Sequence, residues 1–264
     1  KYSQILIDGD PVVSSLASVY GLEHFPEEMV DQIEIVKGGG SSLYGSGAIA
    51  GVINMITRRP LLNQMRIKYL NNLTEGKMDQ RIGAVAETVN KGGTSGAYVF
   101  GSTRIRDHYD YNGDGFSELS DLRNESIGFK WYYRPIATGE LLTSFHRIHE
   151  ERRGGNKFDL PVHEAEIAEW IEHWRSGGTV RWHHQVGPLF DYRFFFSYAF
   201  LNRKSYYGGL GGETDRDRLD ALAFYGRTEN LLHISGIQVN YRYRGHLLTT
   251  GLQYSREKLV DETS

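Results

Sequence analysis

The 264-residue sequence contains no cysteine and only 6 prolines. Without thiols there is no disulfide framework and no thiolate nucleophile, which fits either a cytosolic chain or a cell-envelope chain that avoids thiols. No run of 18 apolar residues occurs, so the sequence contains no candidate transmembrane helix. The formal net charge is only −3, so we expect no binding of nucleic acid.

Catalytic motifs are missing as well. There is no nucleophile elbow, and "HEAEI" at His163–Ile167 lacks the second histidine of a metalloprotease helix. The glycine-rich "GGGSSLYGSGAIAG" at 38–51 has no lysine and serine placed as in a phosphate-binding loop, and no long helix follows it. We therefore expect that the protein is not an enzyme.

Glycine and aromatic residues are abundant instead, with 31 glycines and 17 tyrosines. From Gln64 onward, long segments alternate between apolar and polar residues, as half-buried strands do. In "MRIKYL", Met65, Ile67 and Tyr69 share one face. In a second stretch, one face carries Ile127, Phe129, Trp131 and Tyr133, and the other carries Lys130. In two further stretches, one face carries Tyr192, Phe194, Phe196, Tyr198 and Phe200, or Ile237, Val239, Tyr241 and Tyr243.

The connections between these segments alternate in length. Short turns are expected at Asn90–Gly93, Arg134–Gly139, Val186–Leu189 and Arg242–His246, and long links at Asp107–Arg123, Glu150–Trp174 and Lys204–Asn230. This rhythm is typical of an outer-membrane β-barrel; a soluble β-sandwich is the alternative. About nine strands are expected, and because an open sheet would leave unpaired edges in lipid, we expect more strands after Ser264 in a longer polypeptide.

Residues 1–60 differ from the rest, because their segments are short and mixed. "QILIDGDPVV" (Gln4–Val13) predicts a strand and a tight turn, and "PEEMVDQ" (Pro26–Gln32) predicts one or two helical turns. "IEIVKGG" (Ile33–Gly39) predicts a strand that ends in glycines. A strand-like segment then follows a stretch rich in small residues.

Two stretches, "ILIDGDPV" (Ile5–Val12) and "VDQIEIVKGGGSSLYGSGAIAGVINMITR" (Val30–Arg58), resemble the second half of the plug domain of TonB-dependent outer-membrane transporters. The motif residues are Asp8, Gly9, Gly38, Tyr44, Gly45, Gly47, Gly51 and Asn54. The resemblance implies a mainly β fold. Residues 1–60 would be the C-terminal half of an α/β plug, and residues 61–264 the N-terminal part of a 22-stranded antiparallel barrel.

The resemblance also implies a location and partners. The protein would lie in the outer membrane of a Gram-negative bacterium, among lipid. It would import a small molecule with work supplied by TonB and its inner-membrane energising complex, whose binding segment lies outside this chain. Arg58 and Arg59, at the plug–barrel junction, would pair with carboxylates of the wall or else lie in a solvated periplasmic turn.

Within this family the chain looks most like the cobalamin transporters. "DYNGDGFSE" (Asp110–Glu118) falls in the second outer link and has the spacing of an EF-hand calcium loop. The predicted calcium ligands are the side chains of Asp110, Asn112, Asp114, Glu118 and Asp121 and the carbonyl of Phe116. Asp121 stands where a glutamate usually closes such a loop, and the alternative is an acidic loop without an ion.

The third and fourth outer links supply candidate ligand-binding residues: Arg152, Arg153, Asn156, Glu166, Trp170, Tyr206 and Tyr207. In "PVHEAEIAEWIEHW" (Pro161–Trp174), Ile167, Trp170, Ile171 and Trp174 follow helical spacing, so a helix is expected there. "RRGGN" (Arg152–Asn156) offers donors for a ligand, or else forms a turn with salt bridges.

The sequence thus predicts TonB-dependent import of a scarce, bulky nutrient, first of all cobalamin or another corrinoid, with calcium ordering the outer loops. A haem or iron-siderophore receptor is an alternative, although His146 and His149 are better explained as rim or lumen residues than as haem ligands. A further alternative is a membrane platform that docks a surface lipoprotein through the link Lys204–Asn230.

Overall fold

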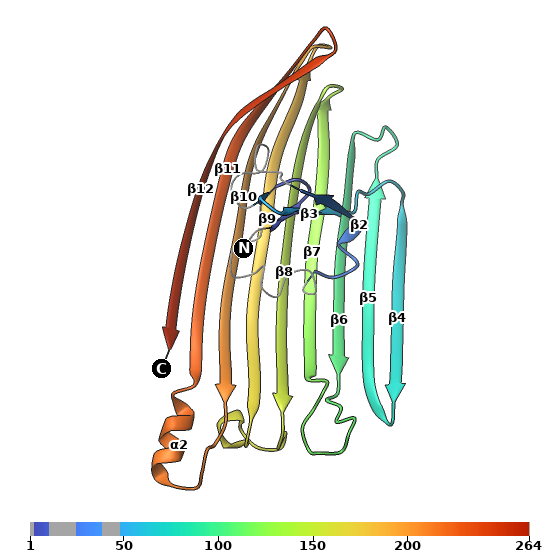
Figure 1. Ribbon diagram of the computed structural model, residues 1–264. Coiled ribbons are helices and arrows are strands. Elements are labelled where there is room, and N and C mark those ends of the chain that lie inside the picture. Colours follow the sequence, from blue (N-terminus) through green and yellow to red (C-terminus); the bar gives the residue numbers. More distant parts are fainter. Residues whose placement is uncertain (1–2, 11–24, 39–47, 264) are drawn as a thin grey trace.

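The computed structural model describes residues 3–10, 25–38 and 48–263. They form two sheets, and Figure 1 shows the small sheet lying against one face of the large one. The small sheet contains β1 (Ser3–Ile7), β2 (Val30–Lys37) and β3 (Gly51–Thr57). The large sheet contains β4 (Gln64–Thr74), β5 (Lys77–Val89), β6 (Ser95–Arg106), β7 (Asp121–Ile136), β8 (Gly139–Gly155), β9 (Ala168–Val186), β10 (Phe190–Gly208), β11 (Tyr225–Tyr243) and β12 (His246–Thr263).

The large sheet is a continuous antiparallel meander. Its strands follow one another in sequence order from β4 to β12, so the described residues contain the nine strands that the sequence predicts. The strands lengthen from 11 residues in β4 to 19 in β9, β10 and β11. A strand of about ten residues is enough to cross a bilayer, so the longest strands are longer than a crossing requires.

No helix among the described residues is long and apolar enough to cross a membrane.

The two ends of the large sheet differ in their connections, as the sequence predicts. Tight turns join β5 to β6, β7 to β8, β9 to β10 and β11 to β12 at one end. Longer loops join β6 to β7, β8 to β9 and β10 to β11 at the other end, which we call the outer end (Figure 1). The exception is the two-residue turn Glu75–Gly76, where both residues have positive φ (48° and 83°). This geometry matches the twist of the flanking strands.

Two helical predictions are wrong. The stretch 161–174 contains only a 3₁₀ turn, η3 (Val162–Glu164), and its aromatic part belongs to β9. Pairing of β9 with both β8 and β10 satisfies its backbone along the whole strand, and this long-range pairing overrides the local helical spacing. Likewise, Glu27–Met29 forms a turn, and Val30 already begins β2.

The two faces of the large sheet have opposite chemistry. The face turned away from the small sheet, the outer face, carries exposed apolar residues such as Ile127 (62% exposed) and Phe194 (49% exposed). The face that the small sheet covers, the inner face, carries buried polar residues such as Lys130 and Thr179. This arrangement inverts that of a soluble sandwich, which buries its apolar side chains between sheets, and suits a wall between lipid and a polar lumen.

A hydrophobic cluster joins the small sheet to the inner face. In the small sheet, β1 pairs parallel with β3, and β2 pairs antiparallel with β3. Side chains from both sheets form one buried cluster that includes Ile5, Ile7, Phe25, Met29, Met55, Val85, Phe100, Phe195, Leu232 and Ile234. The small sheet is therefore packed on the wall rather than loosely tethered to it.

Candidate functional site at the contact of the two sheets

A tight turn after β1 carries the most densely bonded contact between the sheets. Asp8 and Gly9 both have positive φ (52° and 83°), the conformation of a two-residue hairpin turn. Two backbone hydrogen bonds close it, from Ile7 N to Asp10 O (2.9 Å) and from Asp10 N to Ile7 O (3.0 Å). Gly9 N also donates to Asn54 Oδ1 on β3 (2.9 Å), which fixes the turn to its own sheet.

The Asp8 carboxylate connects the turn to β7. It accepts hydrogen bonds from Thr57 N (2.8 Å) and from Thr57 Oγ1 (2.6 Å). Lys130 Nζ lies 2.9 Å from Asp8 Oδ2 and also donates to Thr57 Oγ1. Lys130 is only 5% exposed, and a buried ammonium is tolerated only when its charge and its donors are satisfied. Asp8 and Thr57 meet both requirements.

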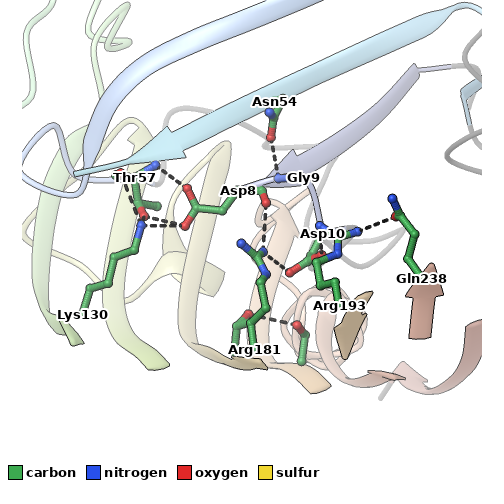
Figure 2. A network of polar contacts seen from close by, with 11 residues as sticks. Asp8, Gly9, Asp10, Asn54, Thr57, Lys130, Arg181, Arg193 and Gln238 are labelled. Atoms are coloured by element: carbon green, nitrogen blue, oxygen red, sulfur yellow. Dashed lines mark hydrogen bonds and ion pairs between the residues drawn. The ribbon is translucent and has the colours of Figure 1, made fainter. Parts of the chain in front are cut away.

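Asp10 extends the contact to β9 and β10. Its carboxylate is fully buried and pairs with Arg181 and with Arg193, whose Nη1 lies 3.6 Å from Asp10 Oδ1. Arg181 Nη2 also donates to the Asp8 carbonyl (2.9 Å), and Arg193 Nη2 donates to Gln238 Oε1 on β11 (3.1 Å). Figure 2 shows these side chains converging on the turn from neighbouring strands. We call Asp8, Asp10, Lys130, Arg181 and Arg193 the aspartate clamp.

The segment that connects β3 to β4 makes a second ionic contact with the large sheet. Arg59 Nη2 is 2.5 Å from Glu140 Oε2 on β8, and Arg134 Nε is 2.8 Å from the same oxygen. The Arg59 guanidinium also lies over the Tyr132 ring. The predicted pairing with a wall carboxylate is therefore confirmed for Arg59. Arg58 has no ion pair among the described residues, and its backbone N–H donates to the Met29 carbonyl (2.9 Å).

A buried arginine without a carboxylate partner in the described ranges, Arg175, lies farther toward the outer end. Arg175 on β9 is 1% exposed, and its three guanidinium nitrogens have no hydrogen-bond partner among the described residues. Its charge lies over the Phe25 ring, 4.3 Å from the ring centroid. His146 on β8 is also buried and meets the same ring edge-on, with centroids 5.8 Å apart. We call Phe25 together with Arg175 and His146 the Phe25 cap.

A cavity of about 810 Å³ lies beside Phe25, between the turn at Glu27 and the inner face of β5–β8. Its wall side reaches Arg106 at the end of β6 and Leu122 at the start of β7, so it extends to the outer end of the sheet. This volume lies in the range of pockets that hold compact organic ligands. We call this cavity the vestibule.

Four arginines line the vestibule: Arg81, Arg104, Arg106 and Arg152. Carboxylates neutralise three of them: Glu27 and Glu28 face Arg81, Asp79 faces Arg104, and Glu150 faces Arg152. Arg106 differs, because its guanidinium donates to the carbonyl and hydroxyl oxygens of Ser120 (3.1 Å each). Both acceptors are neutral, so Arg106 makes no ion pair among the described residues, although the charges of Asp79 and Glu150 act on it from nearby.

The acidic loop between β6 and β7 brings together three of the predicted calcium ligands. Oxygens of Asp110, Asp114 and Glu118 lie within 4.8 Å of one another, a spacing compatible with ligands around one calcium ion. These carboxylates also accept backbone hydrogen bonds within the loop, for example from Gly113 N and Gly115 N to Asp110. Asn112 Oδ1 accepts from Asp114 N, and Phe116 N donates to Asp114.

Asp121 does not join this group. It begins β7, and its carboxylate accepts a hydrogen bond from His108 N and lies 3.1 Å from His108 Nδ1. The twelve-residue spacing of an EF-hand is therefore present in sequence, but the last position fixes the base of the loop instead of closing the acidic group. The His108 ring stacks on Phe158, which ties this loop to the next one.

The seven candidate ligand-binding residues separate into two groups. Arg152 lines the vestibule, and Tyr207 falls on the inner face by strand alternation and is 44% exposed. The others have partners that hold the outer loops. Asn156 and Glu166 hydrogen-bond to each other, Arg153 donates to the Lys157 carbonyl, Trp170 donates to Glu151, and Tyr206 is buried in an aromatic cluster with Tyr225.

The histidines do not form a haem site in the described residues. His146 is packed under Phe25 on the inner face, whereas His149 stacks on Trp174 at 3.7 Å on the opposite face of the sheet. Neighbouring odd and even positions of β8 point to opposite faces. The two side chains therefore do not converge on one ligand.

Most of the described plug-motif residues allow or support a specific backbone conformation. Gly51 has φ of 143°, and a Cβ there would lie 2.5 Å from the Val36 carbonyl oxygen, so only glycine fits. Gly38 has φ of 105°, and Asn54 supports the turn at Gly9. Tyr44, Gly45 and Gly47 lie outside the described residues.

Sequence reasoning missed the wall side of the site: Lys130, Arg181, Arg193, Arg106 and Arg175. A signal was present for Lys130, because it interrupts an aromatic strand and falls on the face opposite its aromatic neighbours. A lone charge in such a position indicates a polar lumen, but it does not reveal which carboxylate it meets.

Comparison with known proteins agrees with this arrangement. The family model described as the TonB-dependent receptor plug domain matches residues 1–52. A vitamin B12 transporter of Vibrio vulnificus is 44% identical over 52 residues, which cover 20% of this chain and 8% of the relative. A ferric enterobactin receptor of Pseudomonas aeruginosa is 41% identical over 66 residues, which cover 21% and 9% of the two chains.

Solved structures match almost the whole chain. A siderophore receptor of Pseudomonas aeruginosa superposes with a TM-score of 0.68 at 17% identity, over 98% of this chain and 41% of that receptor. A siderophore receptor of Acinetobacter baumannii gives a TM-score of 0.72 at 14% identity, over 98% and 38%. The chain thus spans about two fifths of the length of these receptors and shares their fold. Residues 1–52 thus match the plug domain of TonB-dependent receptors, and the chain as a whole is similar in fold to receptors that carry this domain.

Proposed function

We propose that the protein imports a scarce, bulky nutrient across the outer membrane, with TonB and its inner-membrane complex supplying the work. The aspartate clamp and the shared hydrophobic cluster hold the plug against the wall. The vestibule offers a ligand a cavity at the outer end, above the plug. Passage then requires the plug to move, which is mechanical work rather than catalysis.

The observation that carries the ligand class is the charge of Arg106. It lines the vestibule, and neutral oxygens of Ser120 hold it in place. An arginine held only by neutral oxygens still offers charge-assisted hydrogen bonds to an anionic ligand. A ferric tris-catecholate is such a ligand, because three doubly deprotonated catecholates outweigh the charge of Fe³⁺. Relatives described as ferric enterobactin and siderophore receptors support this choice.

Binding and uptake of ferric enterobactin by the full-length protein test this proposal. We expect binding in detergent, uptake only in cells that contain TonB, and about tenfold weaker binding for Arg106→Met, because one charge-assisted contact is lost. Arg123→Met is the matched control, since Arg123 is exposed and already pairs with Glu125. Equal binding by the wild type and Arg106→Met would contradict the assignment of Arg106. Absence of TonB-dependent uptake of any tested nutrient would contradict import.

A corrinoid is the second candidate ligand, and the acidic loop favours it. The plug match to a vitamin B12 transporter and the grouping of Asp110, Asp114 and Glu118 support a receptor whose outer loops are ordered by calcium. Three clustered carboxylates repel one another, and a bound calcium ion would remove that repulsion. Asn112 and the Phe116 carbonyl would complete the ion's oxygen ligands.

Calorimetric titration of the purified protein with calcium tests this second candidate. We expect uptake of one calcium ion by the wild type and its loss in Asp114→Ala. Asp159→Ala, in the next outer loop and outside the acidic group, serves as the control. Cyanocobalamin binding that disappears with a chelator would establish the corrinoid and displace the siderophore. No calcium uptake by the wild type would remove calcium from the proposal.

A platform for a surface lipoprotein is a further candidate function. The loop between β10 and β11 carries α2 (Asp215–Leu222), which projects beyond the strands (Figure 1). Leu219, Leu222 and Phe224 are exposed on this loop, and exposed apolar groups at a tip favour contact with another protein. Co-purification of an outer-membrane lipoprotein that is lost in Leu219→Asp would support docking, and co-purification that survives removal of residues 209–224 would contradict it.

A further inference from the structure

The Phe25 cap contains a buried cation, Arg175, that lacks hydrogen-bond acceptors in the part of the chain that the structure describes. Arg175 is buried, and none of its guanidinium nitrogens has a hydrogen-bond partner among the described residues. A buried charge without hydrogen bonds is strongly unfavourable, and a cation–π contact such as that with Phe25 offsets only part of that penalty. The arrangement therefore favours any movement that gives Arg175 a partner.

The position of the cap relates Arg175 to the path of a ligand. Phe25 belongs both to the lining of the vestibule and to the contact with Arg175. Arg175 itself does not line the vestibule. Phe25 thus contacts both the cavity and the guanidinium, and we expect its withdrawal to join the two.

Arg175 is held more firmly by backbone pairing than Phe25 is. Arg175 pairs through its backbone with Ile148 on β8 and with Leu201 on β10, in the middle of long ladders. Gly177 lies next along the inner face of β9, and a Cβ there would come within 2.7 Å of the His146 ring. By contrast, Phe25 lies in a loop directly before the turn at Glu27–Met29, and its ring is held by the hydrophobic cluster between the sheets rather than by backbone pairing.

We propose that Arg175 is a second, deeper binding site for an anionic group, such as a catecholate, carboxylate or phosphate, which opens when Phe25 withdraws during transport. The guanidinium then offers its planar set of donors to the passing ligand. Arg106 attracts the anion into the vestibule, and Arg175 receives it one step farther into the lumen. This inference rests on the proposed import function.

The transport test compares uptake with equilibrium binding in the full-length protein, with ferric enterobactin as the probe. For Arg175→Met we expect binding in detergent within about twofold of wild type, because the closed site is covered, and initial uptake reduced about tenfold or more, because a charge-assisted contact is lost. Arg175→Lys keeps the charge and is expected to retain more uptake. Arg203→Met is the matched control, since Arg203 is on the inner face of β10 and donates to Thr228.

The opening test does not depend on the affinity of Arg175 for the ligand. The chain has no cysteine, so His146→Cys places a single thiol in this chain beneath Phe25. We expect a water-soluble maleimide to label it in energised cells that are importing ferric enterobactin, and not in cells without TonB. Absence of labelling in importing cells would overturn the opening of the cap, even if Arg175→Met failed to fold.

The remaining outcomes separate this inference from the proposed function. No TonB-dependent uptake by the wild type would overturn import itself. Normal uptake by the wild type and by Arg175→Met would overturn only the role of Arg175. Uptake of cyanocobalamin but not of ferric enterobactin would leave import standing and overturn the anionic ligand class.

Discussion

The aspartate clamp and the Phe25 cap both bring charged wall residues against the plug, but they solve the problem of burial in opposite ways. In the clamp, Lys130 meets the Asp8 carboxylate and the Thr57 hydroxyl, so the buried ammonium has its counter-charge and its acceptors. In the cap, Arg175 meets an aromatic ring and no hydrogen-bond acceptor among the described residues. One plug therefore has two charged contacts with the same wall: one whose charges are satisfied, and one whose charge is not and which relies on apolar packing of Phe25.

For the proposed import function, this difference predicts which part of the plug moves first under load. Breaking one partner from a buried, hydrogen-bonded ion pair costs about 3–5 kcal/mol, whereas opening the cap exposes a cation to water or to a ligand. We expect the clamp to act as a pivot and the cap to act as the opening edge.

Removing the charge of Asp8 is expected to have the largest effect. In Asp8→Asn the buried Lys130 loses its counter-charge, so we expect the plug to lose about 3–5 kcal/mol of stability on the wall. Hydrogen exchange at the amides of β1 and β3 measures this loss in the full-length protein. Asp31→Asn is the matched control, because Asp31 is exposed on β2. Unchanged exchange in Asp8→Asn would show that the clamp is not the pivot.

Replacing Arg175 by methionine is expected to act in the opposite direction. An apolar side chain of similar length removes the unpaired charge, and replacement of buried charges by packed apolar residues stabilises other proteins by about 1–4 kcal/mol. We expect slower hydrogen exchange around Phe25–Met29 in Arg175→Met than in the wild type. Faster exchange there would mean that the cation–π contact holds the cap closed, which would invert the comparison.

The turn geometry of the clamp predicts a smaller loss. Gly9 has φ of 83°, and a Cβ there would meet no atom closer than 3.9 Å. Gly9→Ala therefore introduces backbone strain without a clash, and about 1–2 kcal/mol of destabilisation is expected. Gly92→Ala, in a tight turn where no such φ is required, is the control. Thermal unfolding of the plug in both variants measures the difference, and equal melting temperatures would contradict the strained turn.

The smallest expected effect is the pH dependence of the stability that Glu27, near the Phe25 cap, contributes to the plug. A hydrogen bond from Lys68, with help from the charge of Arg81, lowers the pKa of Glu27 below its ordinary value of 4.5. The stabilisation is thus present above pH 4.5 and is lost as pH falls through the lowered pKa. Because Glu27 is half-exposed, we expect less than about 1 kcal/mol.

Thermal unfolding at pH 6 and pH 3 measures this contribution. The melting temperature of Glu27→Gln is expected to lie slightly below that of the wild type at pH 6, and the difference is expected to shrink as the pH falls toward 3. A difference that does not shrink between pH 6 and pH 3 would show that the carboxylate charge is not responsible. The clamp variants provide the contrast, since their larger losses come from buried groups.

Local pattern predicted much of the fold. Period-two alternation located the strands of the wall, because one face of each strand meets a different solvent from the other. Glycine-containing turns located their connections. The same approach failed at Ile167–Trp174, where apolar spacing imitates a helix. Pairing of β9 with two neighbours decided the outcome there, and such pairing depends on residues far away in the sequence.

The sequence predicted only part of the candidate site. The motif around Asp8 and Gly9 and the carboxylates of Asp110, Asp114 and Glu118 stand close together in the sequence, so their grouping was predicted. Asp121 was misplaced, because its partner His108 lies at the other end of the loop. Asn156 and Glu166 were expected to face a ligand, but they satisfy each other.

The sequence by itself determined the class of the protein: a plug motif, strands with one apolar face, and an acidic outer loop. Only the tertiary structure decided which charges meet. Asp8 and Lys130 are 122 positions apart in the chain and touch, and Asp10 and Arg181 are 171 apart. Burial and pairing are properties of the assembled wall and plug, so only the folded chain distinguishes the satisfied Lys130 from the unsatisfied Arg175.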